Sequence, residues 1–369
     1  MVRKPRKAPR SAAGGPDKAR LRILVVQLSA GFAGTERHAA ELVNGLAPHA
    51  EVALLLRARP GETHRQAEYA ALRAAVAPGI PVFLSSRAAP CLGLWRALWR
   101  FRPDLIHAHH ERSARVAALC AGRFGIPVVA TVHVHYRARD FGGCRALIVL
   151  NEAERVRVRA SFPREVALIE NWVVPQPRPD AVRLAALRRE LGIAAGDFVV
   201  GSVGRLAPVK RVGGVIAAFA QAGLERSRLI VVGDGGERPA LEADVARLRL
   251  GDRVRLAGFR ADVREFYALF DVLVLNSADE PYGLVILEAA ASGVAVIATA
   301  TDGARAIGAR LPIALVPTDQ PAALAQAMRA AHAARHANSP PFAGFSFEER
   351  LPALLALYRR VRDGGISGA

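Results

Sequence analysis

The chain has 369 residues, of which 51% are hydrophobic and 23% charged, and its formal net charge is +18. This length exceeds one typical domain and predicts two, each large enough to bury its own core. No apolar run reaches the ~18 residues that a bilayer-spanning helix requires, which argues against an integral membrane protein. The three cysteines are far apart and form no CxxC pair, which argues against a disulfide framework and a zinc site and favours a reducing compartment.

Residues 1–20 differ in composition from the rest of the chain. They hold seven basic side chains against one acid and are rich in proline, glycine and alanine. We expect a basic disordered tail here, and the lack of an apolar stretch argues against a secretory signal. The basic surplus of the whole chain favours polyanionic partners such as nucleic acid, an anionic membrane face or phosphorylated substrates, and a solvated basic surface is the alternative.

From residue 21 onward, short apolar runs alternate with helical patterns. Before the proline cluster at 171–180 the runs are LRILVVQL, EVALLL, PVFLS, DLIHAH, PVVATVH and ALIVLN; after it they are FVVGSVGRL, RLIVVGDG, VRLAG, DVLVLN, AVIATA and IALVP. Runs apolar on both sides and separated by helices are typical of parallel sheets covered on both faces. The pattern predicts an α/β chain with two doubly wound, Rossmann-like domains, 21–176 and 177–345, facing across a cleft. The last helix, 346–363, is expected to pack back on the first domain.

The segment GSVGRLAPVKR (201–211) carries the first candidate site residues, because ligands of doubly wound sheets bind at the carboxyl ends of strands. The strand breaks at Gly204, which places Arg205 and Lys210 on the loop and at the start of the next helix. Lys210 is the sole lysine after residue 18 in a chain that otherwise uses arginine. Two fixed positive charges suit a diphosphate, and a compact ammonium suits a crowded pocket beside a phosphate oxygen. The alternative is a lysine retained by chance on the surface.

The segment DEPYGLVILEAAASG (279–293) follows a predicted strand and begins a helix near Gly283 or Leu284. Free amides at that helix start would form an anion site. Glu280 precedes the turn and Glu288 lies about one turn inside the helix, so that one carboxylate can accept hydrogen bonds from a ribose and the other from a hexose. Acids in the first turns of a helix are also ordinary surface residues. Glu288, however, lies in an otherwise apolar run, where an unpaired charge is costly.

Together these motifs resemble the retaining nucleotide-sugar glycosyltransferases of family 4, which have the GT-B fold. The resemblance covers nearly the whole folded chain and rests on GRLAPVK, the E-x7-E pair, VVGDGGERPALE, and DLIHAHHERSARVA followed by PVVATVH. It implies that Arg205 and Lys210 bind the donor diphosphate and stabilise the departing nucleoside diphosphate. It also implies that Glu280 holds the transferred sugar and Glu288 the ribose, while the loop near Arg260 meets the nucleobase through backbone groups.

The resemblance also implies a wider set of site residues. The implied catalytic residues are Arg205, Lys210, His133 and Glu280, and the implied donor-binding residues are Gly34, Gly204, Arg260, Pro281, Tyr282, Gly283, Leu284 and Glu288. Gly34 lies in the loop GFAGTER, where Ala33 departs from the two adjacent glycines of relatives. His133 matches a histidine near the reacting centre, where a neutral imidazole can exchange a hydrogen bond as charge develops. A structural histidine at a strand end is the alternative.

No metal and no other cofactor is implied. The chain contains no D-x-D pair, the usual ligand set of metal-dependent GT-A enzymes. We interpret His107, His109 and His110 as a strand end and a structural motif, because no matching carboxylate accompanies them. The implied reaction retains the anomeric configuration, with the two basic residues stabilising the charge left on phosphate.

The sequence contains little information on which acceptor the chain binds. CLGLWRALWRFRPD places Trp95 and Trp99 one turn apart on a helix rich in arginine. Such a helix can lie in an anionic membrane interface, but we favour the interpretation that its aromatics are core. From the resemblance and the charge we expect a glycan or lipid-linked glycan acceptor of lipopolysaccharide type, and a cytoplasmic enzyme with peripheral binding to the inner face of the cell membrane as an option.

Two alternatives stay open. A GT-B relative can be a sugar-nucleotide epimerase or a glycoside phosphorylase, the latter with phosphate or a pyridoxal cofactor. A basic polyanion-binding protein, from a different class, would fit the charge. No recognised nucleic-acid motif occurs, so nucleic acid is not an expected partner.

Overall fold

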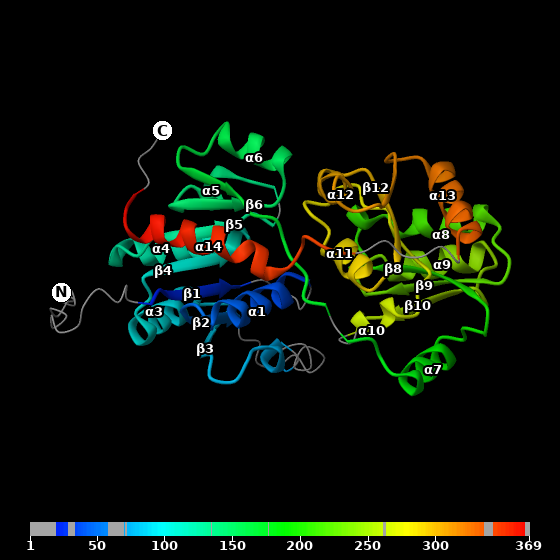
Figure 1. Cartoon of the computed structure of the whole chain (residues 1–369), viewed down its shortest axis with the longest axis horizontal. Coiled ribbons are helices and arrows are strands. Elements are labelled where there is room, and N and C mark those ends of the chain that lie inside the picture. Colours follow the sequence, from blue (N-terminus) through cyan, green and yellow to red (C-terminus); the bar gives the residue numbers. More distant parts are fainter. Residues whose placement is uncertain are drawn as a thin grey trace.

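The computed structural model describes residues 20–28, 34–57, 70, 72–133, 135–175, 177–260, 263–335 and 342–365. The predicted basic tail, apart from its last residue, Arg20, lies outside the described residues. The described chain forms two lobes, each built on one parallel sheet with helices packed on both faces (Figure 1). The predicted α/β architecture of two doubly wound sheets is confirmed.

The first lobe contains a seven-stranded sheet in the order β3-β2-β1-β4-β5-β6-β7. Its strands are β1 (Arg22–Gln27), β2 (Glu51–Arg57), β3 (Val82–Ser85), β4 (Leu105–His109), β5 (Val128–Thr131), β6 (Ala146–Val149) and β7 (Glu165–Leu168). Its helices are α1 (Gly34–Leu46), α3 (Pro90–Phe101), α4 (His110–Ala121), α5 (Ala138–Phe141) and α6 (Glu152–Arg159), with a 3-10 turn η1 (Gly122–Phe124). β7 matches none of the predicted apolar runs, because Val166 alone among its four residues is buried at this sheet edge.

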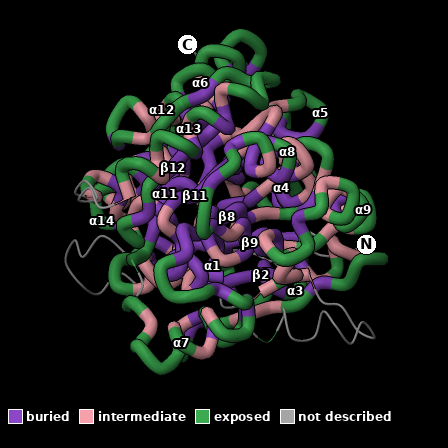
Figure 2. The backbone as a smooth tube through the Cα atoms, turned by 90° about the vertical axis from the view of Figure 1, so that its right-hand side faces the viewer, coloured by how far each residue is buried: buried purple, intermediate pink, exposed green. Residues whose placement is uncertain are grey.

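The second lobe contains a six-stranded sheet in the order β10-β9-β8-β11-β12-β13. Its strands are β8 (Phe198–Val203), β9 (Ser227–Val232), β10 (Val254–Gly258), β11 (Val272–Leu275), β12 (Ala295–Thr299) and β13 (Ala314–Val316). Its helices are α7 (Ala181–Glu190), α8 (Val212–Ala222), α9 (Arg238–Arg247), α10 (Val263–Tyr267), α11 (Leu284–Ala291), α12 (Asp302–Gly308) and α13 (Pro321–Ala333), with a 3-10 turn η2 (Pro208–Lys210). Buried backbone follows the strands through the interior of the molecule, whereas α7 lies exposed at its rim (Figure 2).

Helix α14 (Phe347–Arg362) follows the second lobe in sequence but packs on the first (Figure 1). Its apolar face, with Leu354, Leu357 and Tyr358, joins the core between α1 and the first sheet. A capping box starts the helix, in which the Ser346 hydroxyl accepts from the Glu349 amide and the Glu349 carboxylate accepts from the Ser346 amide. The first lobe is thus covered by a helix from the far end of the described chain.

The two chain segments that cross between the lobes lie side by side. The amide of Val173 donates to the carbonyl of Phe345 over 3.0 Å, which joins the outward crossing to the return crossing. Trp172 is buried in the core of the first lobe and its ring lies 5.0 Å from that of Phe347. The hinge region is therefore anchored on the first lobe by aromatic packing.

Helix α3 corrects one prediction from the sequence. Its buried side is made by Leu94, Ala97, Leu98 and Phe101. Trp95 and Trp99 lie on the other side, with 40% and 73% of their surface exposed, so the interpretation that these aromatics are core is wrong. Within the described ranges, no helix is long and apolar enough to cross a membrane.

Candidate active site

Lys210 and Glu280 meet at the carboxyl edge of the second sheet. β8 ends at Val203, and the short η2 turn places Lys210 directly before α8. The amide of Ala278 donates to the carbonyl of Val209 over 2.8 Å, which ties this turn to the segment that carries Glu280. The Lys210 ammonium and the Glu280 carboxylate form an ion pair, with side chains 24% and 12% exposed. The structure therefore brings together two of the predicted catalytic residues.

Glycines allow the loops at this edge to approach one another closely. Gly204 follows β8 and Gly233 follows β9, both with positive φ. A Cβ on Gly233 would lie 1.9 Å from the carbonyl oxygen of Gly204, a distance that no side chain tolerates. Gly204 is thus part of a backbone contact that only glycine at position 233 permits.

Arg205 extends from the same loop and is exposed. No ion-pair partner of Arg205 is present in the part of the chain that the structure describes. Burial lowers the pKa of His110 in the first lobe; Glu36 and Glu111 oppose this shift, and the positive charge of Arg205 adds to it. Arg205 therefore lies close enough to the first lobe to act electrostatically on the start of α4.

The starts of α11 and α1 face one another across the boundary between the lobes. α11 begins at Leu284, and Gly283 before it has a φ of 95°, a left-handed conformation that favours glycine. α1 begins at Gly34, and a Cβ placed there would lie 3.3 Å from Cδ1 of Leu284. The amide-bearing, partly positive ends of two helices thus point towards one region. This geometry suits an anion.

The turn between Glu280 and α11 is held from both lobes. The side-chain amide of Asn151, in the first lobe, donates to the carbonyl of Pro281 over 2.7 Å. Tyr282 is buried in the second core. The amide of Gly303 donates to the carbonyl of Glu280 over 3.1 Å. The predicted donor-binding turn therefore lies at the contact between the lobes with a fixed backbone.

Glu288 is buried and hydrogen-bonded on both carboxylate oxygens. Oε1 accepts from Arg37 of α1 over 3.0 Å, and Oε2 accepts from the Tyr267 hydroxyl over 2.8 Å. Arg264 lies 3.6 Å from the same carboxylate and also pairs with Glu41 of α1. With 8% of its side chain exposed, Glu288 is not the ordinary surface acid of the alternative interpretation. Its partners come from both lobes.

Four histidines gather at the carboxyl ends of β4 and β5. His133 Nε2 lies 2.8 Å from Nδ1 of His109, and the ring of His110 lies 5.0 Å from that of His133. His107 contacts the Thr131 hydroxyl and the Tyr358 hydroxyl, each at 2.7 Å. Burial lowers the pKa of His133 and of His109 well below the usual range, and neighbouring histidines add to both shifts. The described residues contain no cluster of three or more histidine, cysteine or acidic side chains that could hold a metal ion.

The His133 end of β5 adjoins the Glu280 segment across the lobes. His135, two residues beyond His133, pairs with Asp279 over 2.8 Å. Asp279 is the residue before Glu280. His133 is thus brought to the same interlobe region as the ion pair of Lys210.

The Arg260 side chain points elsewhere. It pairs with Glu190 of α7 and stacks over the ring of Phe266 at 5.2 Å. The backbone of its loop stays near the site edge, since the Gly258 carbonyl accepts from the Gly233 amide over 2.8 Å. The backbone of this loop therefore adjoins the end of β9, whereas the Arg260 side chain is held by Glu190 and Phe266.

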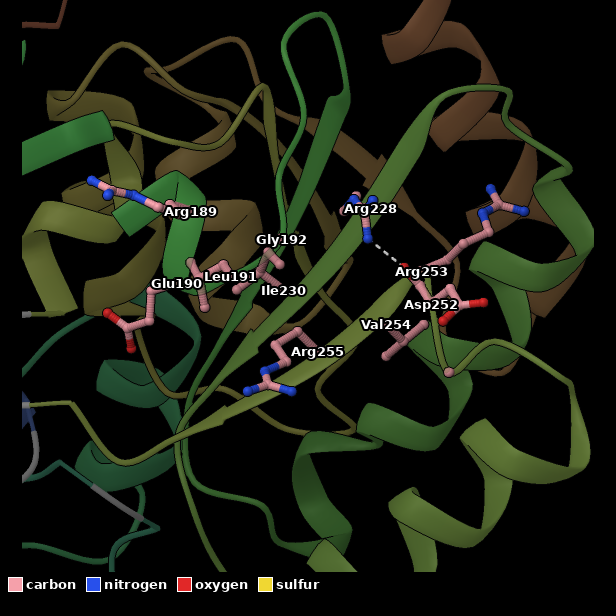
Figure 3. A pocket seen from close by; sticks show the side chains of 11 residues that line it. Arg189, Glu190, Leu191, Gly192, Arg228, Ile230, Asp252, Arg253, Val254 and Arg255 are labelled. Atoms are coloured by element: carbon pink, nitrogen blue, oxygen red, sulfur yellow. Dashed lines mark hydrogen bonds between the residues drawn. The ribbon is translucent and has the colours of Figure 1, made fainter. Parts of the chain in front are cut away.

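A cavity of about 290 Å³ opens beside Glu190, and neither Lys210 nor Glu280 lines it (Figure 3). It is lined by Arg189, Glu190, Leu191, Gly192, Arg228, Ile230, Gly251, Asp252, Arg253, Val254 and Arg255. Arg228 and Val254 lie at the beginnings of β9 and β10, so this cavity lies at the opposite edge of the second sheet from Lys210. Ligands of parallel sheets bind at the carboxyl edge, and we therefore assign no substrate to it.

Several residues of this region were not predicted from the sequence. They are Arg37, Glu41, Asn151, Arg264, Tyr267 and Gly303. Arg37 is the last residue of the loop motif GFAGTER, and that position is the one signal that could have indicated it. The others act through contacts between segments more than 20 residues apart, which leave no local pattern.

Two family models match the chain. The model described as Glycosyltransferase Family 4 matches residues 32–176, and the model described as Glycosyl transferases group 1 matches residues 185–337. The two matches fall on the first and the second lobe respectively.

Curated relatives carry the same class of name. The chain is 31% identical over 209 residues to the lipopolysaccharide core biosynthesis glycosyltransferase LpsD of Rhizobium meliloti, which covers 56% of this chain and 58% of LpsD. It is 30% identical over 316 residues to the D-inositol 3-phosphate glycosyltransferase of Kineococcus radiotolerans, which covers 70% of this chain and 72% of that protein. The match thus spans little more than half the length of LpsD.

Solved structures share the fold. Anabaena Alr3699/HepE in complex with UDP and glucose matches with a TM-score of 0.75 and 22% identity, covering 92% of this chain and 99% of that one. Sucrose-phosphate synthase from Thermosynechococcus elongatus matches with a TM-score of 0.75 and 21% identity, covering 94% and 100%. At this identity the likeness shows the two-lobed architecture alone.

Proposed function

The chain belongs to the group 1 glycosyltransferases of family 4, and from that membership we propose that it moves a sugar from a nucleoside-diphosphate sugar to a glycan or lipid-linked glycan. The observation that carries the proposal is the convergence of Lys210, Arg205 and the starts of α1 and α11 on one interlobe region. Two cationic side chains and two helix N-termini neutralise a diphosphate without a metal ion. HepE, which shares this fold, has UDP and glucose bound in its solved structure, which makes UDP-sugars the first donors to test.

The ion pair of Lys210 and Glu280 supplies one contact to the diphosphate and one to the sugar of the donor. Donor binding exchanges this pair, so that the ammonium moves to a diphosphate oxygen and the carboxylate accepts from hydroxyls of the sugar. Arg205 neutralises the second phosphate. As the glycosidic bond breaks, the two positive charges stabilise the departing nucleoside diphosphate, and this is the largest contribution to rate that we assign to the protein.

Glu288 is proposed to hold the ribose. Its Oε2 is fixed by Tyr267, and its Oε1 is bound by Arg37 from the other lobe. A ribose hydroxyl replaces Arg37 at Oε1 when the nucleotide enters. Because Arg37 belongs to α1, this exchange links nucleotide binding to the relative position of the lobes.

The proposed reaction retains the anomeric configuration. The acceptor hydroxyl attacks from the face that the leaving phosphate vacates, through an oxocarbenium-like state, and passes its proton to the leaving diphosphate. His133 offers a neutral imidazole beside this centre. Contact between the lobes excludes water and limits hydrolysis of the donor.

The acceptor is proposed to be a glycan of lipopolysaccharide type. LpsD, a relative in sequence, is named for lipopolysaccharide core biosynthesis. The exposed side of α3 supports a site of action at a membrane surface, because Leu92, Trp95 and Trp99 lie beside Arg96 and Arg100. Exposed tryptophan next to arginine suits the interface of an anionic bilayer. We therefore propose peripheral binding at a membrane face.

A screen of nucleotide sugars tests the activity. We expect one donor to raise the unfolding temperature and to be consumed only with an acceptor glycan, giving a product with the donor's anomeric configuration by NMR. Free epimerised sugar would instead identify an epimerase, and phosphate-dependent turnover a phosphorylase. Saturable binding of duplex or single-stranded nucleic acid, without nucleotide-sugar binding, would identify a polyanion-binding protein.

Lys210 variants test the site. Lys210→Ala should lower kcat by at least ~100-fold, since loss of one group that stabilises transition-state charge costs about that much. Arg247→Ala is the matched control, because Arg247 is a basic residue of the same lobe that is 66% exposed and pairs with Asp244 over 2.7 Å. Transfer by Lys210→Ala within two-fold of the Arg247→Ala rate would remove Lys210 from the site.

Liposome flotation tests the membrane surface. The unmodified chain should float with vesicles containing anionic lipid and not with neutral vesicles, and Trp99→Glu should abolish flotation. Trp99 is 73% exposed and lies off the buried side of α3, so the fold and the transfer to a water-soluble acceptor should be unchanged. Equal flotation of the variant, or none of the unmodified chain, would end this part of the proposal.

A further inference from the structure

His133 has a buried partner to which the proposed reaction gives no role. His109, the last residue of β4, has none of its surface exposed, and its Nδ1 lies 2.8 Å from Nε2 of His133. The two rings stack with centroids 5.0 Å apart and planes inclined by 19°. We propose that His109 is a positioning residue, which holds His133 in the tautomer that carries its proton on Nδ1.

The direction of this hydrogen bond follows from the other nitrogen of His109. A neutral imidazole has one N–H, so in the pair one ring donates and the other accepts. If His133 donated, His109 would carry its proton on Nε2. That nitrogen is buried and has no hydrogen-bond partner among the described residues. An unpaired buried N–H is rarer and more costly than an unpaired lone pair.

The opposite arrangement leaves only a lone pair unsatisfied. His109 then donates from Nδ1, and His133 accepts at Nε2 and carries its own proton on Nδ1. This arrangement exists only when both rings are neutral. Their surroundings support this, because the rings of His38, His107 and His110 lie 4.6 to 6.1 Å from one or both of them.

Among the histidines of this group, His110 is the one whose pKa is altered by charged side chains. Glu36, Glu111 and Arg205 act on His110. Burial is the largest cause of the lowered pKa of His109 and of His133. The other causes of both shifts are neighbouring histidines, and no carboxylate is among them. Neither ring therefore gains the extra proton that would make the direction of the bond ambiguous.

The consequence for the reaction rests on the proposed function. His133 is 8% exposed, and its Nε2 is taken by His109, so Nδ1 is the ring nitrogen left for a substrate. As a fixed N–H it can donate to a sugar hydroxyl or a phosphate oxygen and cannot serve as a base. His109 thereby selects a hydrogen-bond donor over a proton acceptor beside the reacting centre.

The first test uses the unmodified full-length chain and does not depend on activity. The protein is labelled with 15N-histidine, and the ring signals of His133 are assigned by their absence in His133→Gln. We expect the Nδ1 of His133 to have the shift of a protonated nitrogen and Nε2 that of an unprotonated one. The reverse assignment, or an average of both tautomers, would overturn the proposal.

Substitutions at position 109 add the second test. His109→Leu removes the donor and should leave the His133 tautomers mixed, whereas His109→Asn offers an amide N–H near the position of Nδ1 and should restore the single tautomer. With the donor identified by the screen above, kcat of His109→Leu should fall at least ten-fold with KM changed less than two-fold, and His109→Asn should recover most of the loss. His49→Leu, at an exposed histidine of the same lobe, is the control.

The outcomes separate this proposal from the proposed function. If no nucleotide sugar is turned over, the transferase proposal fails while the NMR result still decides the role of His109. A His109→Leu variant that folds, binds nucleotide and retains kcat within two-fold would overturn the positioning role. If that variant does not fold, the tautomer of the unmodified chain remains the deciding measurement.

Discussion

The buried histidines of α1 and β4, His38 and His107, should make the first lobe sensitive to acid. Burial lowers the pKa of His38 and of His107 from 6.5 to about 3, and the nearby His107 contributes to the shift of His38. Between these values the folded state keeps both rings neutral, while the unfolded chain takes up a proton on each. Stability from this source is complete above pH 6.5 and is lost as the pH falls.

The magnitude follows from the two shifts. Each of these histidines lowers the free energy of unfolding by about 1.4 kcal/mol for every pH unit below its pKa in the unfolded chain. At pH 4.5 the two together remove roughly 5 kcal/mol, which is comparable to the whole stability of many domains. His109 and His133 have pKa values lowered in the same direction, so they add to the loss.

Urea unfolding from pH 7 to pH 4.5, followed by tryptophan fluorescence, measures this loss. All three tryptophans, Trp95, Trp99 and Trp172, belong to the first lobe, and Trp172 packs against His38 with ring centroids 4.0 Å apart. His38→Phe keeps an aromatic ring against Trp172 and removes one titrating group, so its loss between pH 6.5 and 4.5 should be smaller by ~2.7 kcal/mol. A free energy of unfolding that stays constant over this range, or the same slope in His38→Phe, would refute the reasoning.

Two further substitutions test contacts within the second lobe that hold Glu288 and Glu280 in place. Tyr267→Phe removes the hydroxyl that donates to buried Glu288 and should lower the free energy of unfolding by about 2 kcal/mol, since a hydrogen bond to a charged group is worth that much; an unchanged urea midpoint would contradict it. In Gly303→Ala the new Cβ would lie 2.4 Å from Cα of Tyr282 and 2.6 Å from the carbonyl oxygen of Glu280. We expect this variant to displace the Glu280 turn and lose transfer activity at least ten-fold, and a wild-type rate would show that the turn does not position Glu280.

Sequence patterns predicted those parts of the fold and site that depend on residues close together in the chain, such as strands and turns. Apolar runs such as DVLVLN are buried on both faces because helices cover both sides of the sheet, and period and length suffice to identify them. The left-handed turn at Gly283 and the start of α11 at Leu284 are equally local. A glycine directly before an apolar helical run, as at Gly283, indicates this left-handed turn in the sequence.

Contacts between distant segments were not predictable in this way. Nothing near Arg37 indicates that its partner is Glu288, some 250 residues later, because that contact depends on how the lobes pack. The same holds for Trp99, whose spacing from Trp95 fits a buried face and an exposed one equally well. The neighbours of α3 decide between them, and in the structure they cover the side of Leu94 and Leu98. Sequence spacing defines a helix face but not the surface on which it rests.

The return of α14 to the first lobe has a consequence for synthesis on the ribosome. The second lobe has all of its strands once residue 316 has left the exit tunnel, whereas Phe347, Leu357 and Tyr358 of the first lobe's core arrive only with the final helix. The part of the first lobe's apolar core that α14 covers therefore stays exposed to solvent while the second lobe folds. We expect ribosome-bound chains that stop before residue 347 to recruit chaperones through that exposed part of the core.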